Sequence, residues 1–191
     1  MTIVCLHSGP GAAELFASQL GAFDGSAWET PAELTLRPAV DSSVEEWVTA
    51  AAHVIAQTDD GQRHVLATGE AAFGAIMLAA EHPGLVTSLV LGDPVVDESD
   101  DNYWRQMKRV QCPALVVASA PDRATDVAQA QSVAGGIANG VFVIIDGCEA
   151  PAHKNRDSSF NEWLVSFFAI AEGLRSLSDP SEPNQPAMEE V

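Results

Sequence analysis

The stretch HVLATGEAAFGAIMLAAEHPGLVTSLVLGDP, residues 64–94, decides the fold. It begins with a short apolar run that ends at Thr68, continues through an alanine-rich helical segment, and enters a second apolar run over 87–92. Short apolar runs that alternate with helical segments are typical of parallel strands joined by helical crossovers. The stretch therefore predicts a strand, a sharp turn, a helix and a second strand parallel to the first.

The same alternation extends over most of the chain. Strands are predicted near 2–7, 33–37, 64–68, 87–92, 113–118 and 141–146. Apolar residues at helical spacing occur around 15–23, 44–55 and 160–168, between or after these runs. This order predicts an α/β fold, a three-layer α/β/α sandwich with a mostly parallel sheet of about six strands.

The turn that follows the strand near 64–68 has the composition of a tight strand-to-helix elbow. Its sequence ATGEAA, residues 67–72, places small side chains two before, two after and three after Gly69. Such an elbow holds its central residue in a strained conformation that only small neighbours allow. A shifted register would place Glu70 or Ala71 at the tip, and no register supplies a Ser or a Cys. Placing Glu70 at the tip as a nucleophile would also change the spacing between the tip and His82-Pro83. Gly69 is therefore predicted at the tip.

The elbow and three further segments, which together span residues 2–172, resemble the α/β-hydrolase fold superfamily. The segment HSGPG, residues 7–11, is similar to the HGxPG loop of that family, whose backbone N–H groups help to stabilise an oxyanion. The segment SAPDR, residues 119–123, resembles the loop that presents the triad acid, with Asp122 in the place of the acid. The resemblance therefore implies an α/β-hydrolase fold.

The resemblance also implies a degenerate catalytic triad. The position of the serine falls on Gly69, and in the loop after the last strand the position of the histidine falls on Ala150, with His153 three residues later. Serine hydrolysis needs a hydroxyl, an imidazole that takes its proton and a carboxylate that orients the imidazole. Two of these three groups are missing, so the chain is predicted not to be a conventional serine hydrolase.

The resemblance further implies a shallow pocket. The chain begins on the strand that leads into the HSGPG loop, so the antiparallel strands that often precede it in the family are not expected. Only residues 95–111 stand where relatives commonly insert a helical cap. We expect a minimal, capless member whose pocket is open unless a second subunit covers it, and a homo-oligomer is left open for that reason.

Three functions stay open from the sequence. A pseudo-hydrolase would bind a small molecule or a protein partner in the cleft at the carboxyl ends of the strands. A non-hydrolytic enzyme, such as a lyase, isomerase or cyclase, would act on a small carbonyl compound. An esterase-type hydrolase would use rearranged residues. The predicted catalytic residues are Glu70 and Asp122, and the predicted substrate-binding residues are His7, Ser8, Gly9, Gly69, Glu149, Ala150 and His153.

Several of these residues also have a structural interpretation. Partial burial would make Glu70 a useful base, whereas a solvated Glu70 would merely favour the start of a helix through the helix dipole. Asp122 could cap its own loop through hydrogen bonds to nearby backbone N–H groups. His7 could shape the HSGPG loop, and His153 could lie on the surface or behind the ligand.

Bulk properties predict one domain over 1–177 and an acidic, proline-containing disordered tail over 178–191. The 191 residues are 47% hydrophobic, which suffices for a sizeable core, and carry a net charge of −18 with 9 basic against 27 acidic side chains. This balance disfavours nucleic acid and acidic lipid surfaces, because both are bound through clustered Lys and Arg.

Location and cofactors are predicted from what the sequence pattern lacks. There is no signal-peptide pattern at the N-terminus and no apolar stretch long enough to cross a bilayer. Three cysteines cannot all pair, so reduced thiols and a cytoplasmic location are expected. The histidines and cysteines show no metal-ligand spacing, and no cofactor is predicted.

Overall fold

The computed structural model describes residues 2–8, 11–29, 43–57 and 63–178. The strands are β1 (Thr2–His7), β2 (Asp24–Glu29), β3 (Arg63–Thr68), β4 (Ser88–Gly92), β5 (Ala114–Ala120) and β6 (Gly140–Asp146). The helices are α1 (Ala12–Leu15), α2 (Ala17–Ala22), α3 (Ser43–Gln57), α4 (Ala71–Glu81), the short 3-10 helix η1 (Pro83–Leu85), α5 (Asp101–Met107), α6 (Ala128–Gly136), α7 (Ala152–Asn155) and α8 (Asp157–Ser178).

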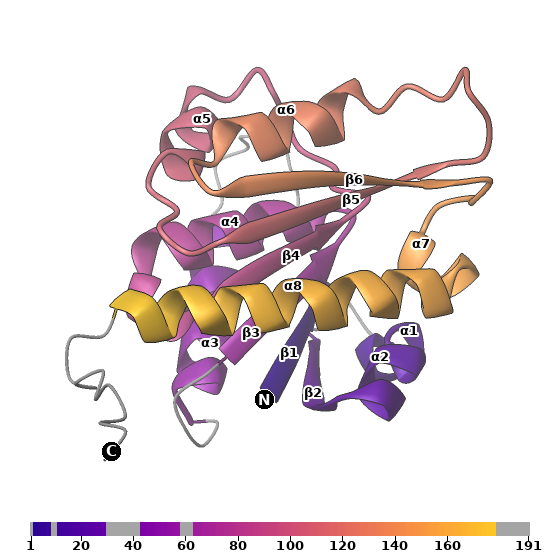
Figure 1. The fold of residues 1–191 in the computed structure, drawn as a ribbon. Coiled ribbons are helices and arrows are strands. Elements are labelled where there is room, and N and C mark those ends of the chain that lie inside the picture. The colour runs from indigo at the N-terminus through magenta and orange to yellow at the C-terminus, as the bar shows by residue number, and fades with distance from the viewer. Residues whose placement is uncertain (1, 9–10, 30–42, 58–62, 179–191) are drawn as a thin grey trace, which may run out of the picture.

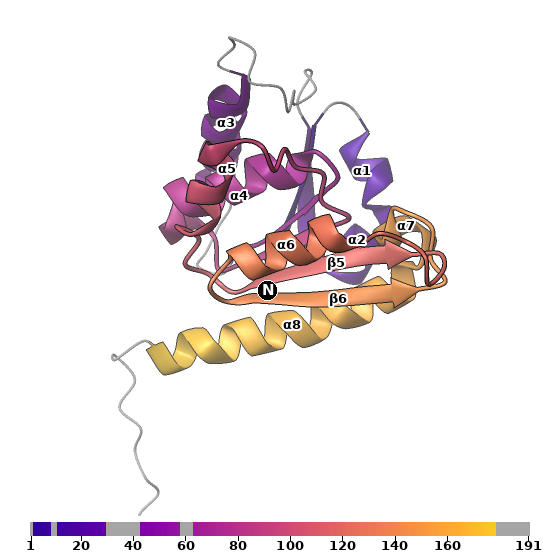
Figure 2. The ribbon, with the colours of Figure 1, turned by 90° about the horizontal axis from the view of Figure 1, so that it is seen from above.

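The six strands form one sheet in the order β2-β1-β3-β4-β5-β6, and all five neighbouring pairs are parallel (Figure 1). The helices lie in two layers. The layer with α3, α4, α5 and α6 covers one face of the sheet, and α8 crosses the other face (Figure 2). The fold class predicted from the sequence, a three-layer sandwich around a mostly parallel sheet, is confirmed.

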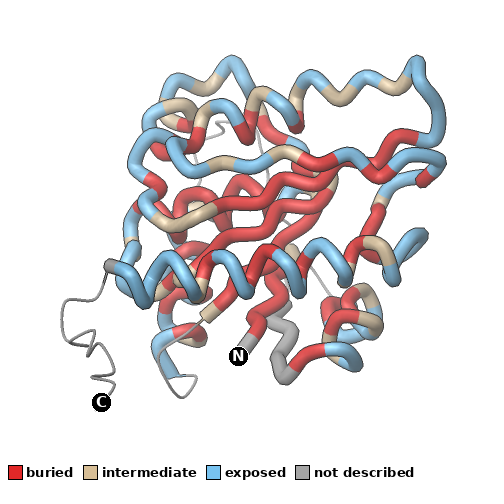
Figure 3. The backbone as a smooth tube through the Cα atoms, viewed as in Figure 1, coloured by how far each residue is buried: buried red, intermediate tan, exposed pale blue. Residues whose placement is uncertain are grey.

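Alternate residues of each inner strand pack into opposite cores. In β3, Val65 and Ala67 belong to the core under α3 and α4, while Leu66 belongs to the core under α8. This alternation follows from the period of two along a strand, and burial on both faces explains why the inner strands read as unbroken apolar runs. Every residue of β4 and β5 is buried, and the inner strands form the buried centre of the molecule (Figure 3).

Five of the six predicted strands are present within one or two residues of their predicted bounds. The predicted strand near 33–37 lies outside the described residues. The strand that neighbours β1 on its outer side is instead β2, which pairs with β1 from Thr2↔Asp24 to His7↔Glu29. Its sequence DGSAWE contains no β-branched residue, so periodicity gave no signal for it.

The tail predicted from residue 178 is also almost entirely outside the described residues. Only Ser178 is described, and there it ends α8. The carboxyl ends of all six parallel strands meet at one edge of the sheet, which is the edge toward which β5 and β6 point in Figure 1. The candidate functional site lies at this edge.

Candidate functional site

The turn between β3 and α4 has the backbone conformation of a sharp elbow at the predicted residue. Gly69 has a φ of +58°, in the left-handed region that favours glycine. Its N–H donates to the Gly92 carbonyl at 3.1 Å, and its own carbonyl accepts from Val95 N at 3.0 Å. These two bonds hold the turn against the end of β4. A Cβ atom added at Gly69 would meet no other atom within 4 Å, so the space in front of the turn is open.

A depression of about 520 Å³ lies in front of this turn. It is lined by His7, Ser8, Leu15, Thr68, Gly69, Glu70, Asp93, Val95, Ala150, Pro151 and His153. Six of the predicted site residues therefore come together here: His7, Ser8, Gly69, Glu70, Ala150 and His153. A second depression of about 520 Å³ lies at the opposite end of the sheet, where Thr87, Cys112 and Arg175 line it, and no carboxylate or imidazole contributes to it. Convergent polar groups favour the first depression as the site.

Asp93 is the best-anchored side chain in this depression, and sequence analysis did not identify it as a site residue. Its Oδ1 accepts from Ser119 N at 2.6 Å, and its Oδ2 accepts from Ser119 Oγ at 2.9 Å and from Ala152 N at 2.8 Å. The carboxylate thus joins the ends of β4 and β5 to the first residue of α7. Through Ala152 it positions the next residue, His153, at the depression.

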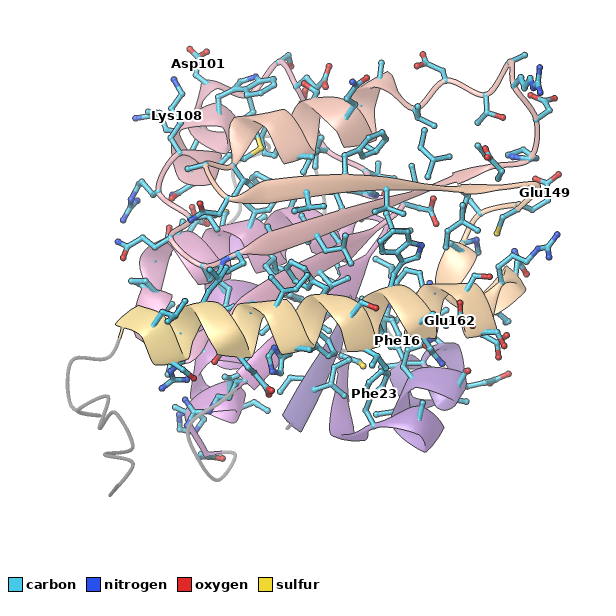
Figure 4. The ribbon with its side chains drawn as sticks, in the orientation of Figure 1. Phe16, Phe23, Asp101, Lys108, Glu149 and Glu162 are labelled. Atoms are coloured by element: carbon cyan, nitrogen blue, oxygen red, sulfur yellow. The ribbon has the colours of Figure 1, made fainter. Side chains whose placement is uncertain are left out.

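His153 is buried, with 1% of its surface exposed, and its ring packs between those of Phe16 and Phe160 at centroid distances of 5.0 and 5.9 Å. Phe16 lies on the same side of the sheet as α8 (Figure 4). Neither ring nitrogen of His153 has a well-formed hydrogen bond to any residue that the structure describes. Burial lowers the pKa of His153 to about 4, even though the Asp93 carboxylate pulls in the opposite direction. At neutral pH the imidazole is therefore uncharged, with one donor and one acceptor nitrogen, and both nitrogens are buried.

Known structures resemble the fold of this chain over most of their length. A serine hydrolase involved in carbazole degradation has a TM-score of 0.72 and 14% identity, over 89% of this chain and 91% of that one. A hydrolase from the metagenome of sediments of the Mar Chica lagoon in Morocco has a TM-score of 0.70 and 14% identity, over 90% and 92% of the two chains. The enol-lactonase from Burkholderia xenovorans has a TM-score of 0.67 and 13% identity, over 88% and 91%. This chain has the α/β-hydrolase fold. No family model and no curated protein matches its sequence.

Within the α/β-hydrolase fold, the turn between β3 and α4 is the one that displays the nucleophile, and the loop after β6 is the one that carries the histidine. The resemblance seen in the sequence assigns these two places to Gly69 and Ala150, and both residues line the depression. Ser8 and Thr68 supply the hydroxyls that line it, and neither is hydrogen-bonded to His153. Desolvation raises the pKa of the Cys148 thiol, which keeps it protonated.

Glu70 lines the depression but is exposed to solvent. It precedes α4 without capping it, and its carboxylate makes no hydrogen bond or ion pair with a residue in the described part of the chain. The burial that its interpretation as a base requires is therefore not present. Glu70 instead presents a solvent-exposed carboxylate at the edge of the depression.

Asp122 and Glu149 do not line the depression. The Oδ1 atom of Asp122 accepts from Ala124 N at 2.8 Å and from Thr125 Oγ1 at 3.1 Å, as the loop interpretation requires. Glu149 is exposed at the outer end of the loop that follows β6 (Figure 4). Gly9 lies outside the described residues, and the surface position considered for His153 is wrong because the residue is buried.

Asp93 could have been suspected from its position alone. It follows a buried strand directly and precedes a proline, and polar residues at the carboxyl ends of parallel strands converge on one edge.

Among the described residues, no three His, Cys, Asp or Glu side chains come together in a way that could hold a metal ion. In the same part of the chain, no helix has both the length and the apolar content needed to span a bilayer.

Proposed function

We propose that this protein is a pseudo-hydrolase that binds a small molecule in the depression at the carboxyl edge of its sheet. The observation that carries the proposal is the conformation of Gly69. Its φ of +58° and its hydrogen bonds to Gly92 and Val95, at and just after the end of β4, give the turn the shape that displays a nucleophile, on a residue that has no side chain. The turn thus has the backbone shape that acyl transfer uses, and it carries no attacking side chain.

The described residues around Gly69 offer no replacement for the missing groups. A serine or cysteine attacks efficiently only when an imidazole or a low pKa activates it. The Ser8 and Thr68 hydroxyls are not bonded to His153, and the pKa of the Cys148 thiol is raised. The histidine position of the fold holds Ala150, whose methyl group can neither accept nor donate a proton.

The depression nevertheless has the properties of a binding site. Its volume of about 520 Å³ is that of sites for small ligands. Apolar side chains of Leu15, Val95 and Pro151 line it together with polar groups that a ligand could satisfy.

A second candidate function is proton transfer on a small carbonyl compound. One observation favours it: an uncharged imidazole and the anchored Asp93 carboxylate line the same depression. A neutral imidazole can act as a base at neutral pH. Exchange of α-protons for deuterium in a bound ketone, catalysed by the protein and lost in His153→Phe, would distinguish this function from binding alone.

Fragment binding with a filled depression tests the proposed function. We expect small molecules detected by saturation-transfer NMR to bind the protein and to be lost in Ala150→Trp, because the indole occupies the depression. Ala124→Trp is the matched control, since Ala124 is exposed on a loop that does not line it. Fragments that bind Ala150→Trp as well as they bind the parent would refute the site. Turnover of p-nitrophenyl acetate that disappears in Ala150→Trp would refute the loss of hydrolysis.

A further inference from the structure

We infer that two copies of this chain associate through an apolar surface on β6 and the adjoining side of α8. No residue of β6 or α8 lines the depression, so the inference goes beyond the proposed binding function and does not depend on it. Three features of the structure support it: the open edge of the sheet at β6, a stripe of exposed apolar side chains on α8, and the near absence of charge from both.

β6 ends the sheet on one side, so one side of its backbone has no strand partner in the described structure. Figure 2 looks down on this edge, and no described helix or loop lies over β6 between its two ends. Its sequence GVFVIID has a high strand propensity and contains neither Lys nor Pro, the residues with which natural edge strands commonly prevent association. Nothing on the strand itself therefore keeps a second chain away.

α8 carries a stripe of apolar side chains along the side that faces β6. Successive members are four or three residues apart, which is the spacing of a helix that packs along another element. One of the five, Phe167, is buried, whereas the other four are 44% to 86% exposed. The α8 stripe consists of Trp163, Phe167, Ile170, Leu174 and Leu177.

Two depressions fix the direction in which the α8 stripe points. Leu174 lines one of them together with Pro113 and Asn139, which directly precede β5 and β6. Val165 is nine residues away, which is half a turn around the helix, and it lines a different depression with Phe23, which directly precedes β2. The stripe therefore faces the β6 edge of the sheet, and Val165 faces the β2 edge.

β6 and α8 hold nearly all the large apolar side chains that are exposed in the described structure. Seven of eight such residues lie on these two elements, and the exception is Val95. Val141 extends the stripe onto the sheet: it is half-exposed and lies on the same face of β6 as Val143 and Ile145, which pack in the core under α8. An apolar patch that gathers on one edge in this way marks an interaction site.

The distribution of charge favours a second copy as the partner. With a net charge of −18, two copies repel each other over most of their surfaces. Residues 140–145 of β6 carry no charge, and residues 163–178 of α8 include only Glu172 and Arg175. Glu172 Oε1 lies 3.3 Å from Nε2 of the buried His64, and neither charged residue belongs to the α8 stripe. Two copies can therefore meet here without bringing like charges together.

The size of the surface is sufficient for a specific dimer. The 22 residues of α8 extend about 33 Å, and the 7 residues of β6 extend about 23 Å. Contact bands about 10 Å wide along both elements bury roughly 1,100 Å² in the two copies together, and a specific interface needs about 1,000 Å². A twofold axis at this edge lets the surface of one copy cover the same surface of the other.

Sedimentation velocity of the full chain tests the inference. We expect a dimer with twice the 20.1 kDa mass of the chain at protein concentrations of roughly 100 µM. Added salt should preserve or tighten the dimer, because it screens the repulsion between acidic copies and does not weaken apolar contacts. A monomer under these conditions, or a dimer that salt dissociates, would overturn the inference and leave the proposed binding function intact.

Matched lysine variants on α8 locate the interface. Ile170 in the stripe is 60% exposed, and Val165 on the opposite side of the helix is 56% exposed. Ile170→Lys should weaken the dimer by at least about 10-fold, because each dimer would bury two unpaired ammonium groups. Val165→Lys should leave it unchanged. Both variants change the net charge equally, so an equal effect of the two would show that the stripe is not the interface and would overturn the inference.

Val141→Lys carries the test to β6 and replaces Ile170→Lys should that variant fail to fold. We expect it to weaken the dimer by a similar factor while its circular dichroism spectrum and thermal unfolding stay close to those of the parent, because Val141 is half-exposed. A folded Val141→Lys that dimerises as tightly as the parent would overturn the inference, since β6 would then lie outside the interface.

Discussion

At the scale of single residues, Gly69 and Asp93 define the carboxyl edge of the sheet. Both have positive φ values, +58° and +44°. Glycine adopts this region without strain, whereas a side chain costs roughly 1 kcal/mol there. Asp93 is held in this conformation by the three hydrogen bonds that its carboxylate accepts.

Replacing Asp93 by Asn should destabilise the fold. Asn tolerates a positive φ, so the substitution tests the hydrogen bonds alone. The amide NH₂ group cannot accept, and at least one donor of Ser119 or Ala152 loses its partner. We expect the free energy of unfolding in urea to fall by about 2 kcal/mol. Asp122→Asn, which affects an exposed carboxylate bonded within its own loop, is the control and should lower it by less than about 1 kcal/mol. Equal losses would contradict the anchoring role of Asp93.

These two residues also show how far the sequence predicts the site. Gly69 was predicted because small neighbours at fixed offsets surround it within six residues. Asp93 was not, because its partners Ser119 and Ala152 lie 26 and 59 residues away in the sequence and no local pattern links them. The burial of His153 was missed for the same reason, since Phe16, which packs against it, comes from the other end of the chain.

At the scale of elements, α4 is the most deeply buried helix of the described structure. Residues 71–80 are all buried, so the helix has no solvent face and its amphipathic signal is weak. It packs against α3 at Gly74, where an added Cβ atom would lie 2.6 Å from Trp47 Cζ3. Glycine is therefore required at this position by the close approach of the two helices.

Gly74→Ala and Gly173→Ala should change the stability in opposite directions. Alanine favours a helix over glycine by about 1 kcal/mol at either position. At Gly74 the clash with Trp47 exceeds this gain, and we expect a net destabilisation of about 1–2 kcal/mol. At Gly173 in α8 an added Cβ meets nothing within 4 Å, so the variant should be more stable by about 0.5–1 kcal/mol. Thermal unfolding of both variants measures the difference, and two changes of the same sign would contradict this packing.

The sheet shows the same division between predictable and unpredictable elements. The strands β1, β3, β4 and β5 were predicted because burial on both faces makes them continuous apolar runs. The strand β2 was not, because DGSAWE resembles a turn by composition and forms a strand through its pairing with β1. Its existence depends on tertiary context that no local pattern carries.

At the scale of the whole molecule, two apolar cores hold the sheet, and the one under α8 contains a titratable group at its edge. His153 is in contact with Phe16 and Phe160, both members of that core. Burial lowers the pKa of His153 from 6.5 to about 4. Between these two values the unfolded chain binds a proton that the folded protein does not, so the stability of the fold falls as the pH falls.

His153→Phe should flatten this part of the pH dependence. The wild type is expected to lose about 3 kcal/mol more than the variant between pH 7 and pH 4 in urea titrations, because Phe keeps the ring packing and cannot titrate. His64, whose pKa is also lowered by burial, keeps part of the slope in both proteins. His53→Gln, at an exposed position of α3, should retain the full slope. Parallel curves for the wild type and His153→Phe would contradict the burial of an uncharged imidazole.

We propose that the α/β-hydrolase frame of this protein presents an elbow without an attacking group. Intact-protein mass spectrometry after incubation with an excess of a fluorophosphonate tests this proposal, because the reagent forms a stable adduct with an activated serine. We expect the mass of the protein to remain unchanged while a serine hydrolase treated in parallel is fully labelled. A stoichiometric adduct on Ser8, Thr68 or any other residue of the depression would contradict the claim.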